Sequence, residues 1–129
     1  MHYADTSALV KLAVVEAESD ALFTWVSGGI ELATSDLART ELVRAVRRVA
    51  PSAIGQARDV LARVILLRAS PAIFEEAARL DPAELRTLDA VHLASALSLG
   101  DDLEGLLTYD DRLADAARVL GVPVVAPGA

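Results

Sequence analysis

The sequence predicts an α/β domain with a central parallel β-sheet covered by helices. Short apolar segments typical of strands alternate with helical patterns along the chain, and capping residues, glycines and prolines separate these segments. The chain has 129 residues, no internal repeat and no interior linker, so we expect a single domain over residues 1–129. A second hydrophobic core is not expected at this length.

Four short apolar segments are the predicted strands. Helical patterns lie between them, and this alternation favours parallel pairing with helices packed on the sheet. The predicted strands are residues 2–5, 30–34, 106–109 and 122–125.

Seven helical patterns begin at capping residues or proline, and most end at glycine or before proline. Thr6 or Ser7, Ser35 and Thr87 are the expected caps of three helices, and Ser70-Pro71 starts another. The predicted helices are residues 8–13, 17–26, 36–50, 52–65, 71–80, 88–99 and 111–120.

Composition excludes several classes of protein. Hydrophobic residues make up 53% of the chain and the mean hydropathy is +0.39, but no apolar run approaches the roughly 18 residues of a membrane span. The chain has no cysteine, which excludes disulfides and thiolate chemistry. Asp5 and Lys11 interrupt the first apolar segment, so we expect no signal peptide, no membrane partner and a cytoplasmic location.

Charge is distributed unevenly along the chain. The net charge of −7 argues against a nucleic-acid partner, yet residues 39–68 carry +5 (7 − 2) and the remainder −12 (5 − 17). Arginine suits phosphate groups, so this segment is a candidate surface for RNA or an acidic partner, with Arg44, Arg47 and Arg48 as the first candidates. These arginines could equally be the solvated faces of two helices, and the sequence leaves both interpretations open.

Four carboxylates, Asp5, Glu41, Asp89 and Asp110, stand inside or against apolar runs. A buried carboxylate without a partner is costly or stays protonated. If the fold brings the four together, a hard divalent cation is the usual solution, because Mg²⁺ and Mn²⁺ prefer oxygen ligands. Asp5 and Asp110 stand at predicted strand ends, where open parallel sheets have their clefts.

Each acid also has a simpler explanation. Asp5 and Asp110 could be helix caps, and Asp89 could favour the positive end of its helix. Glu41 is not at a helix end: at 100° per residue from Leu37 it falls at about 40°, on the apolar face of its helix. A buried pair with an arginine is the alternative there.

The chain offers few other catalytic groups. Lys11 is its only lysine, and His92 lies one turn after Asp89 in an apolar helix. In that setting a hydrogen-bonded core histidine is favoured over a metal ligand or general base. Thr6, Ser7 and Thr108 are candidates to orient the carboxylates, and each could equally be a cap. The cap is the preferred role for Ser7, which leaves Thr6 and Thr108 as the predicted orienting residues.

The segments that carry these acids resemble one family in their order and spacing. They are Tyr3-Ala4-Asp5-Thr6-Ser7-Ala8-Leu9, Ala38-Arg39-Thr40-Glu41-Leu42, Arg86-Thr87-Leu88-Asp89-Ala90-Val91-His92 and Leu107-Thr108-Tyr109-Asp110, followed by the closing segment 121–125. Together they resemble the PIN-domain ribonucleases, and specifically the VapC toxins of bacterial toxin–antitoxin pairs, over the whole chain.

This resemblance implies a PIN-like α/β/α sandwich around a parallel sheet. It also implies a Mg²⁺- or Mn²⁺-dependent endoribonuclease that cleaves RNA, is inhibited by a cognate VapB-type antitoxin and is usually a homodimer. In the family's pattern Asp5, Glu41, Asp89 and Asp110 bind the metal and act in catalysis. The spacing Thr-x-Asp selects Asp110 over the adjacent Asp111 as the fourth acid.

Three alternatives remain. A PIN-domain nuclease of RNA processing would share both fold and acids with a toxin. A catalytically silent PIN module that binds RNA or protein would typically have lost an acid, and all four are present. A receiver-like phospho-acceptor domain also gathers acids at strand ends, but it pairs them with a late lysine, and no lysine follows Lys11.

Overall fold

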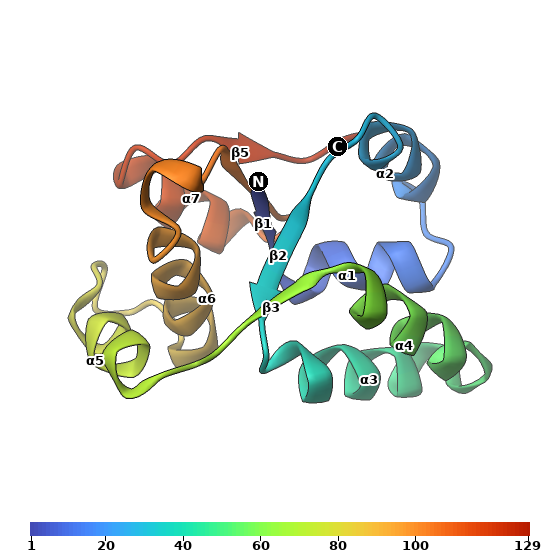
Figure 1. Ribbon diagram of the computed structural model, residues 1–129, viewed down its shortest axis with the longest axis horizontal. Coiled ribbons are helices and arrows are strands. Elements are labelled where there is room, and N and C mark those ends of the chain that lie inside the picture. The colour runs from blue at the N-terminus through green and yellow to red at the C-terminus, as the bar shows by residue number, and fades with distance from the viewer.

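Five parallel strands form one sheet at the centre of the protein. The computed structural model describes all residues from 1 to 129, and the order of the strands across the sheet is β3-β2-β1-β4-β5. Every neighbouring pair is parallel. The strands are β1 His2–Ala4, β2 Leu32–Ser35, β3 Ile65–Leu67, β4 Gly105–Leu107 and β5 Val124–Val125. The predicted fold class is confirmed (Figure 1).

Helices cover both faces of this sheet. In Figure 1, α1 to α4 lie on one side of the strands and α5 to α7 on the other. All seven predicted helices are present, and none is long and apolar enough to cross a membrane. The helices are α1 Thr6–Ala13, α2 Ser19–Val26, α3 Ala38–Val49, α4 Ile54–Arg63, α5 Pro71–Arg79, α6 Thr87–Leu97 and α7 Asp111–Val119, with short 3₁₀ turns at Pro51–Ala53 and Gly100–Asp102.

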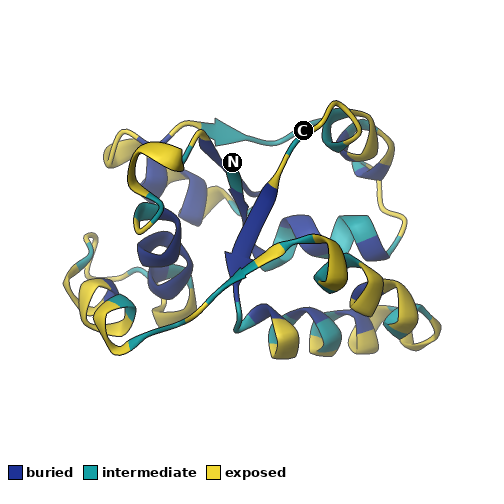
Figure 2. Ribbon diagram, in the orientation of Figure 1, coloured by how far each residue is buried: buried dark blue, intermediate teal, exposed yellow.

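The expectation of a single hydrophobic core is wrong, because each face of the sheet has its own buried cluster. Ala4 and Leu107 are buried on the side of α1 and α3, whereas Tyr3 and Leu106 are buried on the side of α6 and α7. This division follows from the alternation of side chains along a strand. Figure 2 shows the buried residues along β2 and on the sheet-facing sides of α1, α3 and α6. The result is a three-layered arrangement of helices, sheet and helices.

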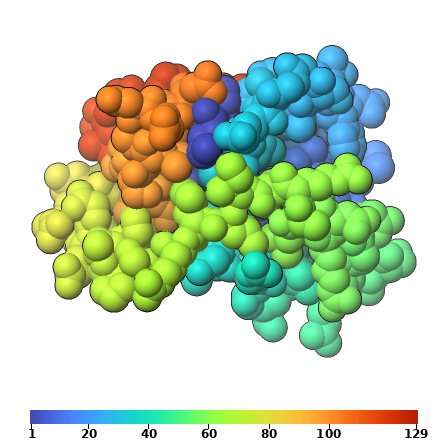
Figure 3. All heavy atoms as spheres, viewed as in Figure 1, coloured from blue at the N-terminus to red at the C-terminus, as the bar shows by residue number.

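The strand β3 is absent from the elements predicted by the sequence. Its three residues follow directly on the amphipathic pattern of α4, and that pattern extends the predicted helix to Ile65. The structure ends α4 at Arg63, and the chain then pairs in parallel with β2 at the edge of the sheet. In the space-filling view this segment crosses between the two groups of helices (Figure 3).

Three predicted caps are also wrong. Asp5, not Thr6 or Ser7, caps α1. Ser35 is the last residue of β2, although its hydroxyl still accepts a hydrogen bond from the Leu37 N–H at 3.2 Å. Thr87 is the first residue of α6, with Arg86 before it and no side-chain cap. In each of these regions a short strand or turn shifts the start of the helix, and local capping signals do not specify such shifts.

Candidate active site at the carboxyl ends of the strands

The carboxyl ends of β1 and β4 lie side by side. Ala4 is in register with Leu107, and the N–H of Asp5 donates to the carbonyl oxygen of Leu107 at 3.2 Å. The residues that follow these two strands therefore share one edge of the sheet, where open parallel sheets bind their ligands. Asp5 and Asp110 both follow strands at this edge, as the sequence predicted.

Asp5 is a buried carboxylate with a full set of hydrogen bonds. Only 5% of the residue is exposed. Its Oδ1 accepts from the Ser7 hydroxyl at 2.7 Å and the Ala8 N–H at 3.2 Å, and its Oδ2 accepts from the Thr108 hydroxyl at 2.7 Å. Burial raises the pKa of the Asp5 carboxyl, although the bonds from Ser7 and Thr108 oppose that shift. Capping and a role in the site are thus compatible for this residue.

Asp89 is the half-buried acid in the first turn of α6. Burial raises the pKa of its carboxyl, and the negative charges of Asp110 and Asp5 raise it further. Arg86 and His92 act in the opposite direction on the same pKa. Asp5 and Asp110, from separate parts of the chain, are therefore both close enough to Asp89 for their charges to act on it.

Asp110 and Asp111 have different surroundings. Asp110 caps α7, because its Oδ1 accepts from the N–H groups of Arg112 and Leu113 at 2.9 and 3.1 Å. Its Oδ2 makes no hydrogen bond and is free for another partner. Asp111 is the exposed first residue of α7. Of the two, Asp110 is the acid whose charge raises the pKa of Asp89.

Glu41 joins the site through a histidine. Its Oε1 lies 2.9 Å from His92 Nε2, and His92 Nδ1 lies 2.7 Å from the Tyr3 hydroxyl. The predicted alternative, a buried pair with an arginine, is not observed, because no arginine forms an ion pair with Glu41. His92 is a buried, hydrogen-bonded residue as predicted, but its contact with Glu41 was missed. The two residues are 51 positions apart, so no local pattern indicates their contact.

The hydroxyl groups around Asp5 differ from the expectation in one respect. Thr108 orients Asp5, as its predicted role requires. Thr6 makes no hydrogen bond to a carboxylate, and its buried Oγ1 has no partner. Ser7 takes that position, and its Oγ also accepts from the Tyr109 N–H at 3.0 Å. The reason is geometric: an N-cap side chain turns back toward the second and third helical residues, and Ser7 and Ala8 occupy these positions after the cap Asp5.

The donor set of this edge fits a hard divalent cation. Its ligands would be carboxylate oxygens, two of the carboxyls have raised pKa values because of burial, and Asp110 Oδ2 and Thr6 Oγ1 are unpartnered. No three His, Cys, Asp or Glu side chains are already arranged around a single point. Like-charged groups separate when no cation lies between them, so a grouped but open arrangement is expected.

The comparison with known families agrees with this geometry. A family model described as PIN domain matches residues 3–119. The chain belongs to the PIN-domain family.

Close relatives of this PIN domain are found in Mycobacterium tuberculosis. The chain is 50% identical over 125 residues to ribonuclease VapC46 (strain ATCC 25618 / H37Rv), covering 97% of this chain and 96% of that protein. It is 46% identical over 132 residues to ribonuclease VapC35 (strain CDC 1551 / Oshkosh), covering 99% and 98%. The resemblance to VapC-type PIN domains is confirmed.

A solved structure supports the fold. The crystal structure of Mycobacterium tuberculosis VapC20, a sarcin-ricin loop cleaving toxin, matches with a TM-score of 0.72 and 19% sequence identity. The match covers 90% of this chain and 95% of that chain. The PIN-like α/β/α arrangement is therefore confirmed.

Two groups of arginines lie at different distances from the acids of this PIN domain. Arg44, Arg47 and Arg48 are exposed on α3 and line a shallow hollow of about 320 Å³ that contains no acid. Arg86 and Arg112 lie beside Asp89 and line a hollow of about 350 Å³ with it. This second pair is not among the residues predicted from the sequence. Its signal was the position of each arginine within three residues of a site acid.

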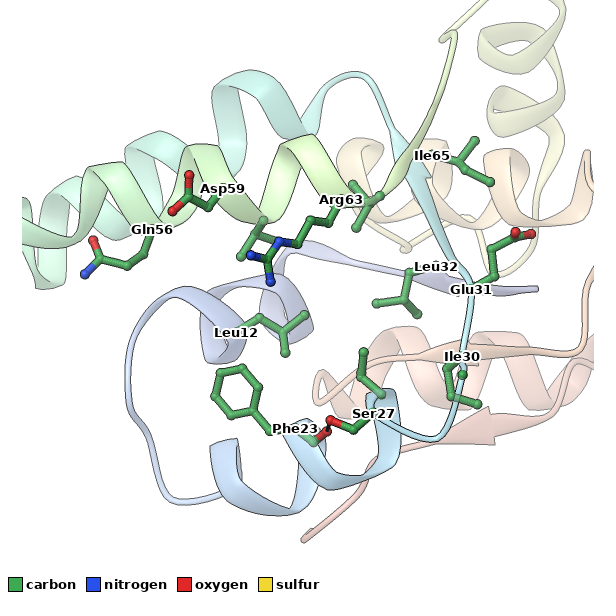
Figure 4. Close-up of a pocket in the computed structure, with 14 residues that line it drawn as sticks. Leu12, Phe23, Ser27, Ile30, Glu31, Leu32, Gln56, Asp59, Arg63 and Ile65 are labelled. Atoms are coloured by element: carbon green, nitrogen blue, oxygen red, sulfur yellow. Dashed lines mark hydrogen bonds between the residues drawn. The ribbon is translucent and has the colours of Figure 1, made fainter.

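The largest hollow of the molecule lies elsewhere. It has a volume of about 720 Å³ and is bordered by α2, α4 and the amino ends of β2 and β3. Figure 4 shows Leu12, Phe23 and Leu32 pointing into it, with Arg63 and Asp59 at its rim. None of the four predicted site acids lines this hollow, so its size does not make it the active site.

Proposed function

We propose that this protein is a Mg²⁺- or Mn²⁺-dependent endoribonuclease, an RNA-cleaving toxin of the VapC type. The observation that carries the proposal is the group of buried or half-buried aspartates at the carboxyl ends of β1 and β4, in which the charges of Asp5 and Asp110 raise the pKa of Asp89. Such a group is costly without a cation. The relatives named as ribonucleases support RNA as the substrate.

Asp5, Glu41, Asp89 and Asp110 are the residues we propose to hold the cation. A bound divalent cation would supply an activated water and stabilise negative charge at the scissile phosphate. Ser7 and Thr108 hold the Asp5 carboxylate in one orientation, and capping fixes Asp110 through a single oxygen.

Arginines would bind the substrate beside the acids. Arg86 and Arg112 flank Asp89 and form no ion pair with any carboxylate, so their guanidinium groups are free to bind phosphates of the RNA chain. Arg44, Arg47 and Arg48 form a second proposed surface, for RNA further along the chain or for an acidic partner. Their support is the charge of +5 (7 − 2) on residues 39–68.

The proposed partners follow from the family. We propose that a cognate VapB-type antitoxin inhibits the protein and that the protein is a homodimer of the cytoplasm without a membrane partner. The VapC names of the relatives support the antitoxin. Co-expression tests this part: growth arrest by the protein alone, relieved by the co-expressed antitoxin, is expected of a toxin. An RNA-processing nuclease would cleave RNA without arresting growth.

Cleavage of RNA in controlled metal conditions tests the activity. Purified protein treated with EDTA should cleave none of a pool of labelled single-stranded RNA, and added Mg²⁺ or Mn²⁺ should restore cleavage. Asp89→Asn, purified in parallel, is the control for contaminating nucleases. Full activity in EDTA would contradict the metal dependence. A folded protein that binds RNA but does not cleave it with either metal would favour the catalytically silent module.

A further inference from the structure

We propose that His92 is a positioning residue for Glu41, held in its Nε2–H tautomer by a buried hydrogen bond from Tyr3. The chain of contacts runs from the Ser35 N–H through the Tyr3 hydroxyl and the His92 ring to Glu41 Oε1, at 3.0, 2.7 and 2.9 Å. It connects β2, β1, α6 and α3 in that order. The role assigned to Glu41 rests on the proposed function, whereas the tautomer does not.

The hydrogen-bond roles can be assigned atom by atom. Glu41 Oε1 is a carboxylate oxygen and can only accept, so His92 Nε2 at 2.9 Å carries a proton. The Tyr3 oxygen accepts the Ser35 N–H, and in the proposed assignment the Tyr3 hydroxyl donates to His92 Nδ1 at 2.7 Å. A histidine nitrogen that accepts carries no proton, so the proton of the neutral ring is on Nε2. That proton points to Glu41 Oε1 at 2.9 Å. In this series of hydrogen bonds from Ser35 to Glu41, each proton then has one acceptor.

The surroundings do not offer Tyr3 another side-chain donor. The nearby hydroxyls of Thr34 and Ser95 donate to the carbonyl oxygens of Ala4 and Val91, each at 2.7 Å. They are therefore not available to donate to the Tyr3 oxygen. The Tyr3 side chain is fully buried and His92 is 2% exposed, so water does not compete for these bonds. Protein groups, and not water, therefore surround the Tyr3 hydroxyl and the His92 ring.

Glu41 depends on His92 for its only hydrogen bond. Asp5 accepts three hydrogen bonds and Asp110 two, whereas Asp89 accepts none and Glu41 has only the bond from His92. Its side chain is 21% exposed and extends from α3, with more rotatable bonds than an aspartate. Fixing one oxygen with Nε2–H also restricts the direction of the other oxygen. Hydrogen-bond partners of metal-binding carboxylates commonly tune the affinity for the metal.

A purely structural role is the competing explanation. In that case the chain satisfies buried polar groups, and its loss lowers stability without changing the properties of Glu41. The two explanations differ in Mn²⁺ affinity at matched folding. The two explanations also differ for a variant whose side chain restores only the hydrogen-bond donor at the Nε2 position: the positioning role predicts that it recovers Mn²⁺ affinity. Glutamine is that side chain, because its amide nitrogen can donate from nearly the same place.

The experiment measures Mn²⁺ affinity by titration calorimetry and the tautomer by ¹⁵N NMR of the histidine rings. His92→Leu is expected to weaken Mn²⁺ binding by roughly 10-fold or more, as loss of a ligand's hydrogen-bond partner does elsewhere. His92→Gln should recover part of that loss. Leu93→Ala, which removes buried volume from the same helix without a polar contact, is the matched control and should leave Mn²⁺ affinity unchanged. In the metal-free wild type, Nε2 should be protonated and Nδ1 not.

Each failure has a distinct meaning. A folded His92→Leu variant with wild-type Mn²⁺ affinity would overturn the positioning role. A wild-type spectrum with Nδ1 protonated would overturn the tautomer, and this readout needs no variant to fold. If the spectrum is as expected but the protein binds Mn²⁺ and cleaves no RNA, the inference stands and the proposed activity fails. If His92→Leu does not fold, Tyr3→Phe replaces it, because the ring remains but its tautomer is released.

Discussion

Two of the hollows on the surface differ most clearly in their lining, and they lie at opposite ends of the strands. The hollow at the amino ends of β2 and β3 has about 720 Å³ and is lined by 14 residues, of which 8 are hydrophobic. The carboxyl edge beside Asp89 has a hollow of about 350 Å³ with 3 hydrophobic residues among 9. The larger region offers apolar surface, and the smaller one is lined by charged side chains of both signs, with Asp89 among them.

The difference lies in what each region can do chemically. Apolar lining with a few charges of both signs, such as Asp59 and Arg63, suits the binding of another apolar surface. Burial raises the pKa of the Asp5 and Asp89 carboxyls, and neighbouring aspartates raise that of Asp89 further, which is a sign of a catalytic or metal-binding site. On this ground of charge, and not volume, we propose the carboxyl edge as the site of the activity.

The largest contrast is expected between acids of the edge and residues of the large hollow. Asp5→Asn or Asp89→Asn should lower RNA cleavage by more than about 100-fold, since loss of a ligand exceeds the roughly 10- to 100-fold cost of losing a ligand's partner. Arg63→Ala and Phe23→Ala, both in the large hollow, should change the rate by less than about 2-fold, within ordinary surface effects. Initial rates on one RNA at saturating Mg²⁺ measure this. Equal losses of cleavage rate in the edge variants and in the large-hollow variants would contradict the assignment of the activity to the carboxyl edge.

A smaller contrast should separate the two neighbouring aspartates. Asp110→Asn keeps a side chain that caps α7 but removes the charge, so the fold should persist and cleavage should fall by at least about 10-fold. Asp111→Asn changes an exposed residue and should leave the rate nearly unchanged. Circular dichroism checks folding, and cleavage rates decide the assignment. Loss of activity in Asp111→Asn alone would identify it as the fourth acid.

The arginines should show a moderate and additive effect. Each arginine that binds a phosphate of single-stranded RNA adds about −0.7 to the slope of log affinity against log salt. Arg86→Ala combined with Arg112→Ala should flatten the slope by about 1.4 and raise KM. The Arg44, Arg47 and Arg48 triple alanine variant should weaken binding of RNA or of the antitoxin, measured by titration at several salt concentrations. If the triple variant binds both RNA and the antitoxin as the wild type does, these arginines only form the solvated face of α3.

The smallest effect concerns stability without metal. Because the folded state raises the pKa of the Asp89 carboxyl, the stability contributed by its protonated form is lost as pH rises through that raised pKa. Asp89→Asn cannot ionise, so the metal-free variant should melt at a higher temperature than metal-free wild type at about pH 7. The difference in melting temperature between the variant and the wild type should shrink toward about pH 4, near the pKa of an aspartate in the unfolded chain. A variant that is less stable at neutral pH would contradict repulsion at this edge.

The sequence predicted what depends on local pattern. The fold class, all seven helices and four of the strands follow from hydrophobic periodicity and from the capping residues, glycines and prolines between segments. The same pattern places Asp5 and Asp110 at strand ends. The strand β3 was missed because three apolar residues after an amphipathic helix fit either element. Its assignment depends on pairing with β2, which is a tertiary contact.

Long-range contacts account for the rest of what was missed in the site. Tyr3 and His92 are 89 residues apart, and His92 and Glu41 are 51 apart, so no local rule joins them. Arg86 and Arg112 become neighbours of one hollow only because α6 and α7 pack on the same face of the sheet. Residue type and spacing could suggest the acids, but not the partners that orient them.

Crystals of the protein soaked with Mn²⁺ offer the most direct test of the central claim. An anomalous difference map should show a peak beside the carboxylates of Asp5, Asp89 and Asp110, and crystals of Asp89→Asn under the same conditions should show a weaker peak or none. A wild-type map in which Mn²⁺ lies elsewhere, from a preparation that cleaves RNA, would contradict the account.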